Sequence, residues 1–124
     1  MERGIITMSE AGTVTIPKTT VWMTKFEIAD MFGVFSGDIR KAILAIYRNK
    51  ELDESETILY VRQPNGVSLD AYSIEMVIAI AFRIRSSGSI RFRKFITDRM
   101  CSRNGNPSVS LFIPCGNKSN PWYN

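Results

Sequence analysis

Apolar side chains between residues 24 and 48 recur at helical spacing, which is typical of helices that bury one face. The pattern stops at Gly33 and resumes after Ser36, so it predicts two short helices joined by a tight turn. Arg40 and Lys41 fall on the polar side of the second helix. The positions expected to face inward are Phe26, Ile28, Ala29 and Phe32 in the first helix and Ile39, Ala42, Ile43 and Ile46 in the second.

The ends of these helices carry capping residues. Thr24 and Glu27 are spaced to bond each other's amides, a capping box that would begin the first helix. Gly33 is the residue type that most easily adopts the left-handed conformation that ends a helix. Ser36 is expected to be the N-cap of the second helix.

The offsets within this stretch match those of a helix-turn-helix. That motif needs a small residue within its first helix, a glycine-like turn and apolar residues that lock the second helix. Ala29, Gly33, Val34 and Ile39 fall at these offsets. An ordinary corner between two helices is the alternative, because any such corner favours a small residue and a glycine.

Alternating apolar and polar residues predict two β-hairpins around this corner. The first is expected within Ile5–Ile16, ahead of Trp22, which we expect to pack as core beneath the first helix. The second pairs Thr57–Arg62 with Val67–Tyr72, because the intervening Asn65-Gly66 is a strong hairpin signal. A hairpin directly after a helix-turn-helix occupies the place of a wing.

Two more helices are predicted after the second hairpin. Ser73 is expected to cap a helix that runs to about Arg85, and Ser89 to cap another after a break at Ser86-Ser87-Gly88. Their inward positions are expected to be Ile74, Val77, Ile78, Ala81 and Phe82 in the third helix and Ile90, Phe92, Phe95, Ile96 and Met100 in the fourth.

Together these elements predict an α+β fold. Residues 1–103 are expected to form one winged helix-turn-helix-like domain with about four helices, an N-terminal β-hairpin and a wing hairpin. Residues 104–124 are expected to be a C-terminal extension in which Val109–Ile113 forms one short strand before a flexible tail.

Positive charge is concentrated late in the chain, which has a net charge of +4 and an isoelectric point near 9.3. From Arg83 to Arg103, seven basic residues are opposed only by Asp98. Such an excess of one sign favours an anionic partner.

Side chains suited to catalysis or metal binding are scarce. The chain has no histidine, and Cys101 and Cys115 lack metal-ligand spacing, so we expect two thiols, no cofactor and no enzymatic activity. The carboxylates from Glu51 to Glu56 are expected to lie in a solvated connector. With no apolar run long enough for a membrane span and no secretory signal, we expect a cytoplasmic protein with neither a membrane partner nor a small-molecule substrate.

Six motifs occur in order along the chain: Trp22–Lys25, Glu27–Val34, Glu51-Leu52, Tyr72–Ala79, Phe82–Ser86 and Phe92–Phe95. Together they resemble the virulence-protein RhuM family of bacterial and mobile-element proteins, over about Ile5 to Met100. The Ser-x-x-x-x-Phe-Arg pattern that starts at Ser87 also resembles the end of the Bro-type amino-terminal domain of phage antirepressors. The resemblance to the RhuM family implies a winged-helix-like DNA-binding module carried by a mobile element such as a conjugative transposon, without enzymatic activity or cofactor.

The expected function is therefore regulatory binding of double-stranded DNA, with the second helix in the major groove. Arg40 is the first choice for a base contact, because an arginine that pairs with guanine is the commonest specific contact. The wing and the basic fourth helix would add phosphate contacts. The expected DNA-binding residues are Ser36, Gly37, Arg40, Lys41, Leu44, Arg62, Gln63, Arg91 and Lys94.

A protein-interaction module with the same fold is the alternative function. Phe35 is expected to be exposed at the tip of the corner, where an aromatic side chain suits an apolar partner. Gly37 offers no side chain to DNA, and Asp38 has the wrong charge for phosphate, although the helix dipole also favours a carboxylate there. Either function is compatible with a homodimer, since helix-turn-helix proteins commonly read paired half-sites.

Overall fold

The computed structural model describes residues 3–101 of the 124-residue chain. Its backbone divides into two units, Met1–Arg93 and Lys94–Asn124, and the boundary falls within helix α5 (Ser87–Cys101). The strand expected at Val109–Ile113 and the tail that follows it lie outside the described residues.

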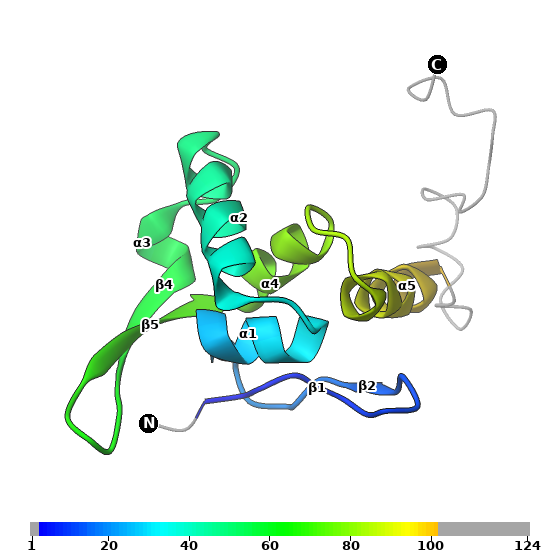
Figure 1. Cartoon of the computed structure of the whole chain (residues 1–124), viewed down its shortest axis with the longest axis horizontal. Coiled ribbons are helices and arrows are strands. Elements are labelled where there is room, and N and C mark those ends of the chain that lie inside the picture. The colour runs from blue at the N-terminus through cyan, green and yellow to red at the C-terminus, as the bar shows by residue number, and fades with distance from the viewer. Residues whose placement is uncertain (1–2, 102–124) are drawn as a thin grey trace. The chain divides into compact units, whose positions relative to one another are not determined.

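Two antiparallel sheets and the helices packed around them make the first unit α+β, as predicted (Figure 1). Strand β1 (Thr7–Met8) pairs with β2 (Val14–Thr15), which confirms the first hairpin. The second sheet has the order β3-β5-β4, and the pairing of β4 (Ile58–Arg62) with β5 (Ser68–Ser73) confirms the second hairpin. Strand β3 (Trp22–Thr24) was not predicted from the pattern; it pairs with β5 and leaves Trp22 half-buried instead of in the core.

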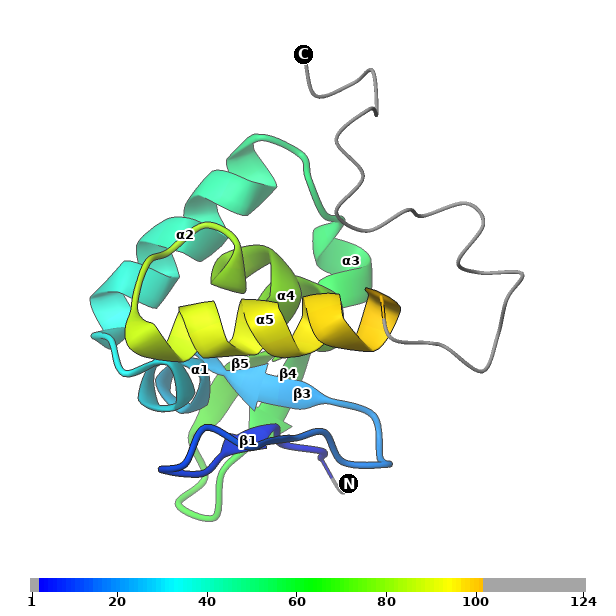
Figure 2. The same cartoon turned by 90° about the vertical axis from the view of Figure 1, so that its right-hand side faces the viewer.

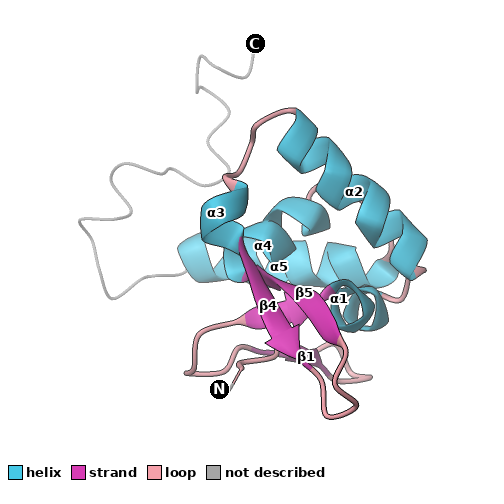
Figure 3. Cartoon of the chain, turned by 90° about the vertical axis from the view of Figure 1, so that its left-hand side faces the viewer, coloured by secondary structure: helices cyan, strands magenta, loops and turns pink. Residues whose placement is uncertain are grey.

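Five helices are present in the described part of the chain, one more than the approximate number predicted. The additional helix is the four-residue α3, which lies in the acidic connector and is capped by Asp53, whose carboxylate accepts from the amide of Ser55 at 2.9 Å. Figures 1 and 3 show α2 on one side of α1 and the β1–β2 hairpin on the other. Before α5, the helices are α1 (Lys25–Phe32), α2 (Ser36–Arg48), α3 (Glu54–Thr57) and α4 (Ile74–Ala81).

The corner between α1 and α2 has the caps predicted for its first half. The hydroxyl of Thr24 accepts from the amide of Glu27 at 3.2 Å, and the carboxylate of Glu27 accepts from the amide of Thr24 at 2.8 Å. Gly33 is left-handed, with a φ of 71°, and ends α1. The N-cap of α2 is Phe35 instead of Ser36, because Ser36 is already the first helical residue.

Seven of the eight inward positions predicted for α1 and α2 are buried, and Phe26 is the exception. Its side chain is 51% exposed. At 3.6 residues per turn, Phe26 lies on the opposite side of α1 from Ile28, and this short helix buries only one side.

The limits and the buried face of α4 differ from the prediction. The helix ends at Ala81 instead of Arg85, and Phe82 beyond it is 55% exposed. Met76 and Ile80 are fully buried in place of Ile74 and Ile78. Because α4 is apolar almost all round, its pattern could not indicate which side packs against α2 and the sheet.

Helix α5 begins earlier than predicted and is capped by a different serine. The amide of Ser89 donates to the hydroxyl of Ser86 at 3.0 Å, and the amide of Ser86 donates to the hydroxyl of Ser89 at 2.9 Å. Ser86 is therefore the cap, and Gly88 lies inside the helix instead of breaking it. Ile90 and Met100, which were expected to face inward, are exposed.

The cysteine prediction is wrong at Cys101, which is disulfide-bonded.

Candidate nucleic-acid interface

The outward face of α2 carries the residues that the sequence predicted for it. Gly37, Arg40 and Lys41 are exposed, Leu44 is 43% exposed, and Ser36 is half-buried. The opposite face of the helix supplies four buried side chains to the core, which fixes the rotation of α2 about its axis. The same packing that buries one face therefore presents the other to solvent.

The two sides of this outward face have different neighbours. Asp38, Lys41 and Ala45 follow one another along the side that faces the segment between α4 and α5. Arg40 lies toward the other side, on which the Tyr47 hydroxyl is 2.6 Å from the hydroxyl of Thr57 in α3. Arg40 and Lys41 thus lie on different sides of the outward face, and Arg48, two turns after Lys41, lies on the side of Lys41.

An open groove of about 400 Å³ lies between α2 and the segment that joins α4 to α5. It brings Arg83 and Arg85 beside Lys41. Sequence reasoning included both arginines in the basic stretch but did not select them as contact residues, because only the fold places that stretch beside α2. The groove is lined by Val34, Asp38, Lys41, Ala42, Ala45, Arg83, Ile84 and Arg85.

The predicted wing residues lie apart from α2. Arg62 is exposed on β4 opposite Ser68, and the amide of Gln63 donates to the carbonyl of Val67 at 2.7 Å to close the hairpin turn. Figures 1 and 3 show the tip of the β4–β5 hairpin pointing away from α2. Lys25, at the beginning of α1, is half-buried.

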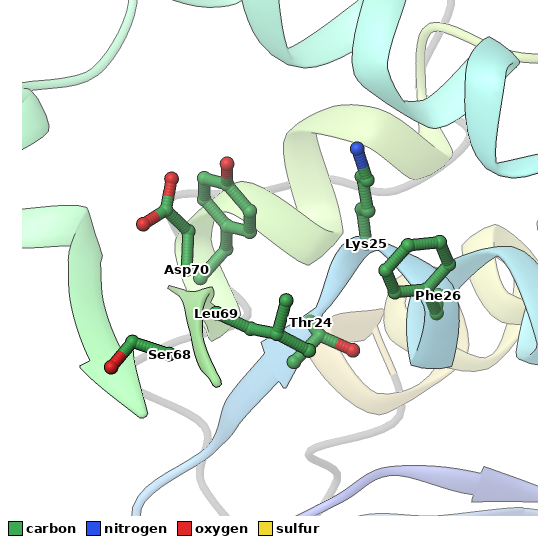
Figure 4. A pocket seen from close by; sticks show the side chains of 7 residues that line it. Thr24, Lys25, Phe26, Ser68, Leu69 and Asp70 are labelled. Atoms are coloured by element: carbon green, nitrogen blue, oxygen red, sulfur yellow. The ribbon is translucent and has the colours of Figure 1, made fainter. Parts of the chain in front are cut away.

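A smaller pocket of about 220 Å³ lies between the beginning of α1 and β5 (Figure 4). Lys25 and Asp70 are the charged residues that line it. Burial, followed by the charge of Asp70, raises the pKa of Tyr72 to about 12, so its phenol stays protonated at neutral pH. The pocket therefore offers charges of both signs and no phenolate.

Arg91 lies apart from the α2 surface, and Lys94 belongs to the other unit of the chain. The side chain of Arg91 lies against Gly12 in the turn of the β1–β2 hairpin. Figure 2 shows α2 above α1 and this hairpin below it. Lys94 belongs to the second unit, where its ammonium lies 3.5 Å from the carboxylate of Asp98. Of the nine predicted residues, the structure brings together the five on α2.

Residues 3–101 contain no group of three histidine, cysteine or carboxylate residues that could hold a metal ion. None of the helices in the same range is long and apolar enough to cross a membrane.

Comparisons of the chain with protein-family models, with curated proteins and with solved structures found no match.

Proposed function

We propose that this protein binds double-stranded DNA through a winged helix-turn-helix in which α2 enters the major groove. The observation that carries the proposal is the outward face of α2, where Arg40 and Lys41 are exposed on a helix that is locked by its buried face. A net charge of +4 supports attraction to a polyanion. The motifs that resemble the RhuM family support a regulatory role on a mobile element.

In this proposal Arg40 and Lys41 have different roles. Arg40 pairs with a guanine edge, because its planar guanidinium can bind two acceptors at once. Lys41 contacts a phosphate, which positions the helix without reading sequence. Arg62 of the wing adds a second phosphate contact farther along the duplex.

The test begins with selection of a preferred site from a random duplex library, followed by binding titrations monitored by fluorescence anisotropy. We expect Arg40→Ala to weaken binding to the selected site by about 1–3 kcal/mol more than binding to random duplex. Arg91→Ala is the matched control, since it removes the same charge from a surface on the other side of α1. Arg91→Ala should weaken binding to both duplexes equally.

If Arg40→Ala lowers the affinity for the selected site and for random duplex equally, Arg40 contacts phosphate and not a base edge. No duplex binding by the unaltered protein, even at low salt, would contradict the proposed function itself.

A protein-interaction module is the second candidate, and the exposure of Phe35 favours it. Its side chain is 83% exposed at the N-cap of α2, where the helix offers it no packing partner. An apolar partner would cover such a side chain more favourably than a phosphate backbone would. This function predicts self-association or partner binding that resists salt and is lost in Phe35→Ser, measured by light scattering after gel filtration.

A further inference from the structure

We infer that the groove between α2 and the segment joining α4 to α5 holds a phosphate group of the DNA backbone between Lys41 and Arg85, and that Asp38 weakens this contact. The inference rests on the proposed function, because it assigns a second contact surface to the same duplex. It adds residues from a distant part of the chain to the interface.

The shape and lining of the groove suit a small anion. Its floor consists of small or half-buried apolar side chains, among them Ala42 and Ala45, which leave room above them. Its charged residues are Asp38, Lys41, Arg83 and Arg85. All four are exposed, so an anion can approach them directly from solvent.

The backbone on both sides of Arg85 is fixed by hydrogen bonds. The amide of Ile84 donates to the carbonyl of Ile80 at 3.0 Å, which extends the end of α4. The hydroxyl of Ser86 donates to the carbonyl of Phe32 at 2.7 Å, which ties the segment to the end of α1. Arg85 is therefore presented from an ordered loop beside the turn that precedes α2.

Arg83 contributes less free charge than the other two basic residues. Its guanidinium forms an ion pair with the carboxylate of Glu51, which follows the end of α2. This pair links the segment after α4 to the far end of α2 and neutralises Arg83. Lys41 and Arg85 then carry the positive charge of the groove, and Asp38 opposes it.

The position of the groove relative to α2 favours a DNA phosphate over other anions. When a recognition helix enters the major groove, its sides approach the sugar-phosphate backbones that border the groove. Lys41 lies on the side of α2 that forms the wall of this groove, beside Arg85. A backbone phosphate would therefore meet both side chains while Arg40 faces the other side.

The first experiment is a salt series of anisotropy titrations with random duplex. We expect Lys41→Gln and Arg85→Gln each to reduce the slope of log affinity against log salt by about one, as removal of one phosphate contact does. Asp38→Asn should raise affinity about two- to fivefold, because it removes a repulsive charge from an exposed site. Lys18→Gln and Asp30→Asn are the charge-matched controls on other exposed surfaces and should leave the slope unchanged.

A second measurement separates this inference from the proposed function. Inorganic phosphate is titrated into isotope-labelled protein, and the amide resonances of residues that line the groove are followed. We expect these resonances to shift, and the shifts to be lost in Arg85→Gln.

Each outcome decides between the two claims. Duplex binding that is unchanged in Arg85→Gln and Asp38→Asn would overturn the groove assignment and leave the proposed function standing. Groove resonances that shift with phosphate in a protein that does not bind duplex would support the anion site and overturn the proposed function. The absence of both effects would overturn both.

Discussion

Helices α1 and α5 begin with the same reciprocal arrangement of hydrogen bonds, but they build it from different chemistry. At α1 a threonine and a glutamate exchange the bonds, and the carboxylate is also bound by Arg3 at 2.7 and 3.0 Å. At α5 two serines exchange them, and the hydroxyl of the second serine, Ser89, is completely buried. One cap is charged and reaches the surface, whereas the other is neutral and internal.

The glycines beside these two helices also serve different purposes. Gly33 at the end of α1 has a φ of 71°, and a Cβ there would meet no atom within 4 Å. Gly88 at the start of α5 has a helical backbone, but a Cβ there would lie 2.7 Å from the carbonyl oxygen of Phe32. The first glycine is needed for its conformation and the second for its small size.

Gly88→Ala should have the largest effect of the substitutions that test this comparison. The added methyl group would meet the backbone of Phe32, which cannot rotate away as a side chain can. We expect a loss of about 3 kcal/mol in the free energy of unfolding, even though alanine favours helix by about 1 kcal/mol. Chemical denaturation measures the change.

Gly33→Ala is the control that sharpens this result. It has space for the methyl group, so it should cost only the left-handed strain of about 1–2 kcal/mol. A larger loss for Gly33→Ala than for Gly88→Ala would reverse the roles that we assign to the two glycines.

Ser86→Ala should have the next largest effect, because one hydroxyl serves both helices. It accepts from the amide of Ser89 and donates to the carbonyl of Phe32, so its removal weakens the start of α5 and the end of α1 together. We expect a loss of about 1–2 kcal/mol in thermal or chemical unfolding. The adjacent Ser87→Ala, at an exposed position, should change stability by less than about 0.5 kcal/mol. Equal losses would show that the hydroxyl of Ser86 has no special role.

Glu27→Gln should have the smallest effect and a distinctive dependence on pH. Burial raises the pKa of Glu27, but hydrogen bonds from Arg3 and Thr24 outweigh it, so the pKa lies below its usual value of 4.5. The carboxylate of Glu27 therefore makes its full contribution to the free energy of unfolding above about pH 5. This contribution is lost as the pH falls through the lowered pKa. Glutamine can keep the capping bonds but not the charge.

The expected result is a loss of about 0.5–1 kcal/mol at neutral pH and a smaller decrease in stability on acidification than in the unaltered protein. Urea denaturation at a series of pH values measures both. A variant with the same acid sensitivity as the unaltered protein would exclude Glu27 as a source of it, whereas Ser86→Ala should keep that sensitivity in full.

The sequence predicted the fold best where the interacting groups are close in the chain. The capping box spans Thr24 to Glu27, and the turn at Asn65-Gly66 closes a hairpin whose strands follow at once. The three-residue β3 was missed because its partner β5 is far along the chain and its own pattern is too short to show alternation.

Only part of the candidate interface was predicted, because only part of it depends on residues that are close in the chain. The outward face of α2 follows from the helical spacing of its buried residues, so Arg40 and Lys41 were found. The contribution of Arg83 and Arg85 was missed, because their proximity to Lys41 depends on how α4 packs and where it ends.

The sequence alone determined the capping box of α1, the left-handed Gly33, the hairpin turn and the buried face of α2. Each of these depends on groups a few residues apart, whose geometry the local backbone sets. The tertiary structure decided that Gly88 lies against Phe32, that the serine cap of α5 also holds the end of α1, and that a basic groove forms beside Lys41. Those features depend on which of several apolar surfaces pack together, and burial rewards any such pairing without regard to distance along the chain.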